Sequence, residues 1–163
     1  MEQYTLGKSI WKVEDYEDMS WQDANVYAMS FVKDAEEALS GNLVLDIDYI
    51  FEWVDNDDTE EHYSFWVAPC TLVFSNVLNF KMSIDKTEYN LDLIDIADIH
   101  LLEKTPVEEG GFWYSWQIEL ADGEITFSSE DMYQVVRQQP IYTDSQVLTL
   151  EERGGVSFSV VPM

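Results

Sequence analysis

Residues 43–54 read LVLDIDYIFEWV, and this run decides the fold class. Every second residue from Leu43 to Trp53 is apolar, which is the period of a half-buried β-strand. The intervening positions carry Asp46, Asp48 and Glu52. A strand over this stretch therefore places three carboxylates on one face, and the sequence raises the question of what they meet there.

Three interpretations of these carboxylates remain open. The first is the solvated face of a strand. The second is a polar cluster whose partners are Lys81, Lys104, Arg137 or backbone N–H groups. The third is a surface that binds a cation or a cationic partner. Apolar residues share the face and indicate partial cover, namely Val44, Ile50 and Val54.

Alternation of period two continues through most of the chain. It is clear in LNFKMSID at 78–85 and in FWYSWQIEL at 112–120, and the Asp122-Gly123 that follows is a strong hairpin signal. The isoleucine-rich LDLIDIADIHLLE at 91–103 favours a strand over a helix. At the C-terminal end, two alternating runs flank 153–155 (Arg-Gly-Gly) and predict a second hairpin.

Two features interrupt this alternation. SSEDMYQVVRQQP at 128–140 begins with serine caps and an acidic first turn and ends at Pro140, so it predicts one short helix near 129–139. Pro69 lies inside the doubly apolar run from Phe65 to Phe74. Because proline cannot donate to a β-ladder, it predicts a bulge or a strand break there.

These patterns predict an all-β fold. We expect an antiparallel sandwich or a partly open barrel of about 8–10 strands, with the one helix near 129–139. The 163 residues and 46% hydrophobic content suit a single domain over 1–163, in which 1–20 form a peripheral N-terminal segment.

The charge of the chain restricts its partners. It has 33 acidic and 8 basic residues, for a formal net charge of −25. Nucleic acids and anionic membranes are bound through Lys and Arg, so we expect neither. A basic protein is the expected partner, and a polyamine or a metal ion is also compatible with the charge. The alternative is that the charge serves only solubility. Without a signal-type or membrane-spanning apolar segment, the expected location is the cytoplasm.

No pattern in the sequence indicates catalysis, and we expect neither enzymatic activity nor a cofactor. Cys70, the single cysteine, lies in an apolar run that predicts a buried, inert thiol. His62 and His100 are too few and too far apart for a zinc site or a nucleophilic triad.

The acidic loop DNDDTEE at 55–61 offers the oxygen ligands that Ca²⁺ prefers. It departs from an EF-hand loop, because Glu60 replaces the glycine and Trp66 replaces the final glutamate. A solvated acidic loop is the alternative. The candidate metal ligands are Asp55, Asp57, Asp58 and Glu61.

The runs NLVLDIDYIFEWV, FWVAPCTLVF, GEITF and RGGVSF also resemble a family of small acidic bacterial proteins that is uncharacterised. Its pattern is DIDYI-x-x-W followed by FWVAP-x-TLVF, and the resemblance covers roughly residues 20–160. Members often carry a His-Asp pair near the start, where this chain has Gln22-Asp23. The resemblance implies no activity and carries no catalytic residue across.

The expected function is therefore a non-enzymatic acidic interaction protein, and an immunity-type inhibitor of a basic toxin is its most concrete form. The candidate partner-binding residues are Asp46, Asp48, Glu52 and Trp113. The alternative is a small-ligand-binding barrel or sandwich with an aromatic-lined cavity. The sequence leaves the oligomeric state open.

Overall fold

A computed structural model describes residues 2–33, 35, 40–56, 62–88 and 90–163, and in it the chain is all-β. One antiparallel sheet of ten strands has the order β1-β9-β4-β3-β2-β6-β7-β8-β5, and β10 pairs with β4 beside β9. The strands are β1 (Ile10–Lys12), β2 (Asn25–Val32), β3 (Asn42–Asp55), β4 (Tyr63–Ser75), β5 (Leu78–Ile84), β6 (Ile94–Pro106), β7 (Phe112–Leu120), β8 (Gly123–Ser129), β9 (Asp131–Val136) and β10 (Ile141–Thr143).

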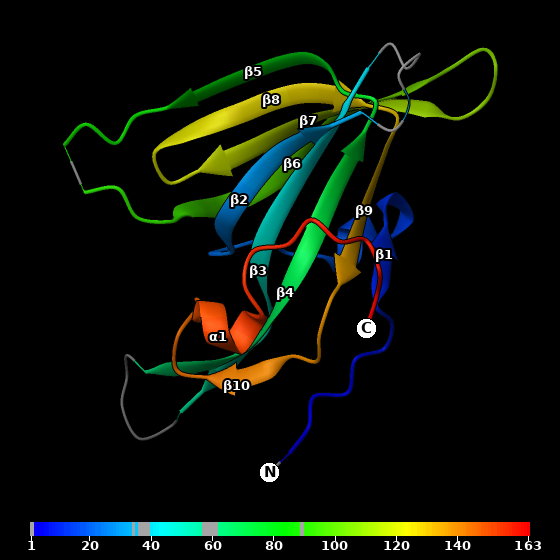
Figure 1. Cartoon of the computed structure of the whole chain (residues 1–163). Coiled ribbons are helices and arrows are strands. Elements are labelled where there is room, and N and C mark those ends of the chain that lie inside the picture. Colours follow the sequence, from blue (N-terminus) through cyan, green and yellow to red (C-terminus); the bar gives the residue numbers. More distant parts are fainter. Residues whose placement is uncertain (1, 34, 36–39, 57–61, 89) are drawn as a thin grey trace.

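The sheet folds over itself into two layers (Figure 1). Its halves are joined where β2 pairs with β6 through only two residue pairs, Asn25 with Asp95 and Val26 with Ile94. The chain crosses from one half to the other at 76–77, between β4 and β5, and returns at Glu130, the single residue between β8 and β9. Over the described residues the sheet does not close into a barrel, so the structure confirms an open, antiparallel all-β fold.

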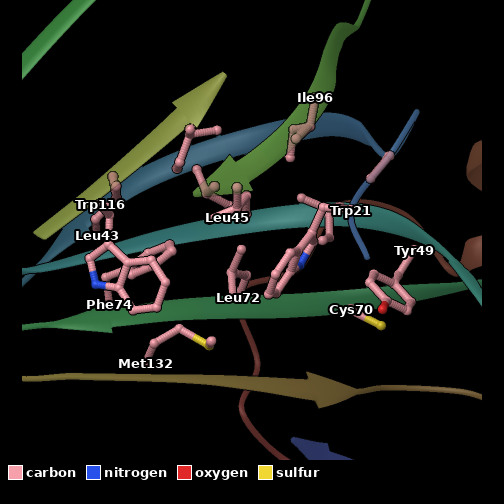
Figure 2. Close-up of a cluster of buried hydrophobic side chains, with 14 of the residues drawn as sticks. Trp21, Leu43, Leu45, Tyr49, Cys70, Leu72, Phe74, Ile96, Trp116 and Met132 are labelled. Carbon is pink, nitrogen blue, oxygen red and sulfur yellow. The ribbon is translucent and has the colours of Figure 1, made fainter. Parts of the chain in front are cut away.

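The core lies between the two layers (Figure 2). Phe74 of β4 contacts Trp116 of β7 and Phe127 of β8 edge to face, with ring centroids 5.4 and 4.7 Å apart. Trp21, from the turn before β2, is also buried and donates its indole N–H to Gln134. Large aromatic side chains thus fill the space between the layers.

Tyr49 makes the core sensitive to alkaline pH. Its phenol is buried and accepts a hydrogen bond from the Ser20 N–H at 2.9 Å, and burial raises its pKa to about 12. The folded state then holds a proton that the unfolded state loses above pH 10, so stability falls as pH rises from about 10 to 12.

The expected loss from Tyr49 is roughly 3 kcal/mol over that range, at about 1.4 kcal/mol per pKa unit. Urea unfolding measured from pH 9 to 12 checks it, with Tyr49→Phe expected to flatten the dependence. Tyr142→Phe, which changes an exposed phenol, is the control. Equal slopes for the parent chain and Tyr49→Phe would contradict the prediction.

The hairpin predicted at Asp122-Gly123 is confirmed, because Leu120 and Gly123 pair across a two-residue turn. The strand predicted over 91–103 is confirmed as β6. The N-terminal segment contributes β1, which pairs with β9, and the 3₁₀ helix η1 (Val13–Asp18).

The helix predicted near 129–139 is wrong, because β8 ends at Ser129 and β9 runs from Asp131 to Val136. β9 pairs with β4 along 70–75 and buries Met132, Val135 and Val136. The hydrogen bonds and burial gained by pairing with β4 outweigh the local helix-capping signals of this segment.

The bulge or strand break predicted at Pro69 is also wrong, because β4 runs through it unbroken and pairs there with β3 in regular register. The amide nitrogen and carbonyl oxygen of a strand residue point to the same side. The Pro69 carbonyl accepts from the Arg137 N–H at 3.1 Å, so its missing donor faces the gap between β10 and β9 and not β3.

The second predicted hairpin, around 153–155, is replaced by the four-residue helix α1 (Leu150–Arg153). Thr149 and Glu152 form a capping box, and Gly154 ends the helix with a φ of 74°. The segment from 156 to 163 then crosses β3 and β4 as an irregular chain (Figure 1).

Candidate functional site

Asp46 and Asp48 lie on the outer face of β3, beneath the C-terminal segment, and neither exposes any surface. Asp46 accepts hydrogen bonds from both nitrogens of the Arg153 fork at 2.6 and 2.8 Å, and from Arg137 at 2.8 Å. Asp48 accepts from the Arg153 Nε at 3.0 Å. Both arginines of the chain therefore converge on these two carboxylates.

This cluster, which we call the Asp–Arg cluster (Asp46, Asp48, Arg137 and Arg153), also fastens the backbone of residues 144–163. The Leu148 and Ser157 N–H groups donate to the two carboxylates at 2.8 and 3.0 Å. Tyr27 covers the Arg153 guanidinium, 4.1 Å from its ring centre. Of the three interpretations of the carboxylates, the structure thus shows a buried polar cluster for these two.

In the Asp–Arg cluster, burial disfavours the charged forms of the side chains, and hydrogen bonds and opposite charges favour them. Burial raises the pKa of Asp48, and the Leu148 N–H and Arg153 act in the opposite direction. Burial acts to lower the pKa of Arg153, but hydrogen bonds and charge from Asp46 and Asp48 raise it above its ordinary value. Because the cluster is neutral in sum, the formal charge of −25 lies outside it.

Glu52 does not share the face of the two aspartates. A β-bulge between Ile50 and Glu52 pairs these residues with Val67 and Trp66, which are consecutive and point to opposite faces of β4. The bulge therefore turns Glu52 to the other side of the sheet, where it is exposed.

The fourth predicted partner-binding residue, Trp113, is half-buried in β7, in the other half of the sheet, where it pairs with Thr105. The prediction of one surface from these four residues is therefore corrected. Asp46 and Asp48 are covered by the C-terminal segment. Glu52 lies on the opposite face of β3 because of the bulge, and Trp113 lies in the other half of the sheet.

Most of the candidate Ca²⁺ ligands in the acidic loop lie outside the described residues. Asp55 is exposed at the end of β3, whereas Asp57, Asp58 and Glu61 lie outside the described residues. In the part of the chain that the structure describes, no three His, Cys, Asp or Glu side chains gather as metal ligands.

A second acidic feature, which the sequence analysis missed, is an open groove of about 600 Å³ beside η1. We call it the acidic-aromatic groove. It is lined by Val13, Glu14, Tyr16, Glu17, Leu101, Lys104, Gly111, Phe112, Tyr114, Glu130 and Asp131. Four carboxylates and three aromatic rings thus border one concave surface.

The 3₁₀ geometry of η1 sets one wall of this groove. Residues three apart eclipse on a 3₁₀ helix, so Glu14 and Glu17 share a face while Val13 and Tyr16 share another. Tyr16 anchors η1 by donating to the Ile99 carbonyl at 2.8 Å. The sequence signal available was this i, i+3 pair of glutamates.

Lys104 places a cation inside the groove. Its ammonium lies 4.1 Å from the centre of the Phe112 ring and 6.0 Å from that of Tyr114. Burial, followed by the charges of Glu14 and Asp131, raises the pKa of the Tyr114 phenol. The groove therefore combines a negative field with aromatic faces that already hold an ammonium.

The remaining reactive side chains are separate from this groove. Cys70 is buried, as predicted, and burial raises the pKa of its thiol. His100 lies 2.8 Å from Glu119 on the surface of the β6–β7 pair. His62 lies 3.8 Å from Asp144 and is exposed.

Comparisons with known proteins find no match: no family model, no curated protein and no solved structure corresponds to this chain. Among the described residues, no helix has the length and apolar character needed to span a membrane.

Proposed function

We propose that this protein is a non-enzymatic interaction protein whose acidic-aromatic groove binds a cationic segment of a basic protein. The observation that supports it is the convergence of carboxylates from η1 and from 130–131 on one groove with the rings of Phe112 and Tyr114. Carboxylates attract and orient Lys and Arg, and aromatic faces add cation–π attraction.

An immunity-type inhibitor of a basic toxin, acting in the cytoplasm, is the concrete form of this proposal. A net charge of −25 steers a basic partner toward the protein from a distance, which raises the association rate. The groove then supplies the short-range contacts. Inhibition would follow from covering the basic surface that the toxin uses for its own substrate.

The first experiment measures binding of a fluorescein-labelled Lys/Arg nonapeptide by anisotropy. The variant Glu14→Gln/Glu17→Gln removes two exposed carboxylates from the groove. We expect its Kd to rise roughly two- to five-fold per carboxylate, in line with exposed ion pairs of up to about 1 kcal/mol.

The matched control is Glu88→Gln/Glu151→Gln, which changes the net charge equally at exposed positions away from the groove. It is expected to weaken binding much less. An equal effect of both variants would show that only net charge matters and would overturn the groove as the site. Binding of the parent chain that does not weaken between 50 and 500 mM salt would contradict an electrostatic mechanism.

A further inference from the structure

A second open cavity, of about 460 Å³, lies where β3, β4 and β10 pair side by side. It is lined by Glu2, Glu52, Val54, Trp66 and Tyr142, and none of these residues lines the acidic-aromatic groove. The alternative raised by the sequence is an aromatic-lined cavity in the interior. The cavity between the two layers is instead lined mainly by aliphatic side chains and holds about 110 Å³, so the aromatic-lined space is the open one.

The register of three neighbouring strands builds one wall of this cavity. Trp66 of β4 lies directly opposite both Glu52 of β3 and Tyr142 of β10. Residues directly opposite each other share a face of the sheet, with Cβ atoms about 4.5–5.5 Å apart. The bulge in β3 creates this row, because without it Glu52 would lie on the face of Asp46 and Asp48.

Two aromatic rings form a corner of the cavity. The ring centroids of Trp66 and Tyr142 are 5.2 Å apart, and their planes meet at 61°. Tyr4 packs against Trp66 and Phe51, with centroid distances of 5.7 and 5.8 Å. Gln139 donates a side-chain hydrogen bond to the Tyr4 carbonyl. These contacts fix the indole, while Tyr142 is exposed and presents its ring to a ligand.

Glu2 and Glu52 give the cavity a negative charge. Both side chains are exposed, and none of the described residues that line the cavity is Lys, Arg or His. Burial, followed by the charge of Glu52, raises the pKa of the Tyr4 phenol, so this charge acts beside the rings. The acidic-aromatic groove, by contrast, already holds the ammonium of Lys104. The open cavity therefore attracts a cation from outside the chain.

The combination of aromatic rings with carboxylates selects the type of cation. Aromatic faces attract cations, Trp most strongly, and groups of rings recognise quaternary ammonium ligands. A primary ammonium is compact and strongly hydrated, so it loses more by leaving water. Methyl groups on the nitrogen instead offer apolar surface to the rings and to Val54. A methylated ammonium thus fits this lining better than a primary one.

We propose that this cavity binds a trimethylammonium group. The methyl groups lie against Trp66, Tyr142 and Val54, and the positive charge lies beside Glu2 and Glu52. The proposal does not depend on the acidic-aromatic groove, so each can fail without the other. The group comes either from a free small molecule or from a trimethylated lysine of another protein, and the test distinguishes these sources.

The test compares choline with two analogues: 3,3-dimethylbutan-1-ol, in which carbon replaces the charged nitrogen, and ethanolamine, which lacks the methyl groups. Binding is followed through the ¹H–¹⁵N signals of the tryptophan indoles at constant ionic strength. We expect choline to shift the Trp66 signal with a Kd on the order of 1 mM. The signal of Trp116, which is fully buried and donates to Ser129, should stay unchanged. Both analogues should bind roughly five-fold more weakly.

Two variants separate the charge from the rings. Glu52→Gln and Tyr142→Leu are each expected to raise the Kd of choline about two- to five-fold. Glu52→Gln should leave the binding of 3,3-dimethylbutan-1-ol unchanged. The matched controls are Glu88→Gln, at an exposed carboxylate away from the cavity, and Phe112→Leu, at an exposed ring of the acidic-aromatic groove. Both should bind choline as the parent chain does.

Three results would overturn the proposal. The first is a Trp66 signal that does not move at about 20 mM choline, well above the expected Kd. The second is a loss of choline binding in Phe112→Leu as large as in Tyr142→Leu, which would place choline in the acidic-aromatic groove. The third is an affinity for either analogue equal to that for choline.

A glycine pentapeptide with trimethyllysine at its centre distinguishes the two sources of the group. Binding roughly ten-fold tighter than choline would assign the cavity to a side chain of a partner protein, since the peptide backbone then adds contacts. Equal binding of the peptide and choline would assign it to a free small molecule.

Discussion

Replacing Arg153 by methionine is expected to destabilise the protein by about 3–5 kcal/mol, because it leaves buried carboxylates without their main partner. Arg153 donates to both Asp46 and Asp48, and all three side chains are fully buried. Urea unfolding at pH 7 measures the loss. Lys8→Met removes the exposed Lys8–Asp15 pair and is expected to cost less than about 1 kcal/mol.

The double variant Asp48→Asn/Arg153→Met restores neutrality in the Asp–Arg cluster and keeps an acceptor for the Leu148 N–H. We expect it to recover a large part of the loss caused by Arg153→Met, because a buried unpaired charge costs more than a buried neutral amide. A double variant as unstable as the sum of its parts would mean that the cluster is not electrostatically coupled.

Replacing Phe74 by alanine is expected to cost about 3–5 kcal/mol, by the loss of buried apolar area and the cavity left behind. Phe74 is fully buried and joins the two layers through Trp116 and Phe127. Thermal and urea unfolding both measure this change. The heat capacity of unfolding should fall with the reduced apolar burial.

Phe31→Ala is the matched control for Phe74→Ala. Phe31 also contacts a ring, that of Phe80 at 5.5 Å, but it is 67% exposed. We expect its replacement to change stability by less than about 1 kcal/mol. Similar losses for both variants would show that the layers are not held together at Phe74.

The sequence predicted the fold class because strand periodicity is a local signal. The alternation in 112–120 and the hairpin that follows it need only neighbouring residues to be recognised, and both are confirmed in β7 and β8. The two-residue turn itself is Ala121-Asp122, and Gly123 begins β8. The segment 129–139 is locally compatible with a helix or a strand. Its pairing with β4, which is distant in sequence, selects the strand, and sequence periodicity cannot reveal that pairing.

The candidate site was harder to predict, for physical reasons. One extra residue at the bulge beside Phe51 reverses the face of Glu52, and no turn residue marks that bulge. Arg137 was among the expected partners of the aspartates, but Arg153 comes from a helical turn 105 residues after Asp48. The groove combines η1 with the β6–β7 and β8–β9 ends, which only the folded sheet brings together.

The Asp–Arg cluster also constrains the order in which parts of this chain can fold during synthesis. Asp46 and Asp48 leave the ribosome more than 100 residues before Arg153, the side chain that neutralises them most directly. Until then, packing the outer face of β3 would bury carboxylates still lacking that arginine, which is unfavourable. We therefore expect the β3–β4 face to stay hydrated during synthesis and folding to finish late, with the closure of contacts of high sequence separation.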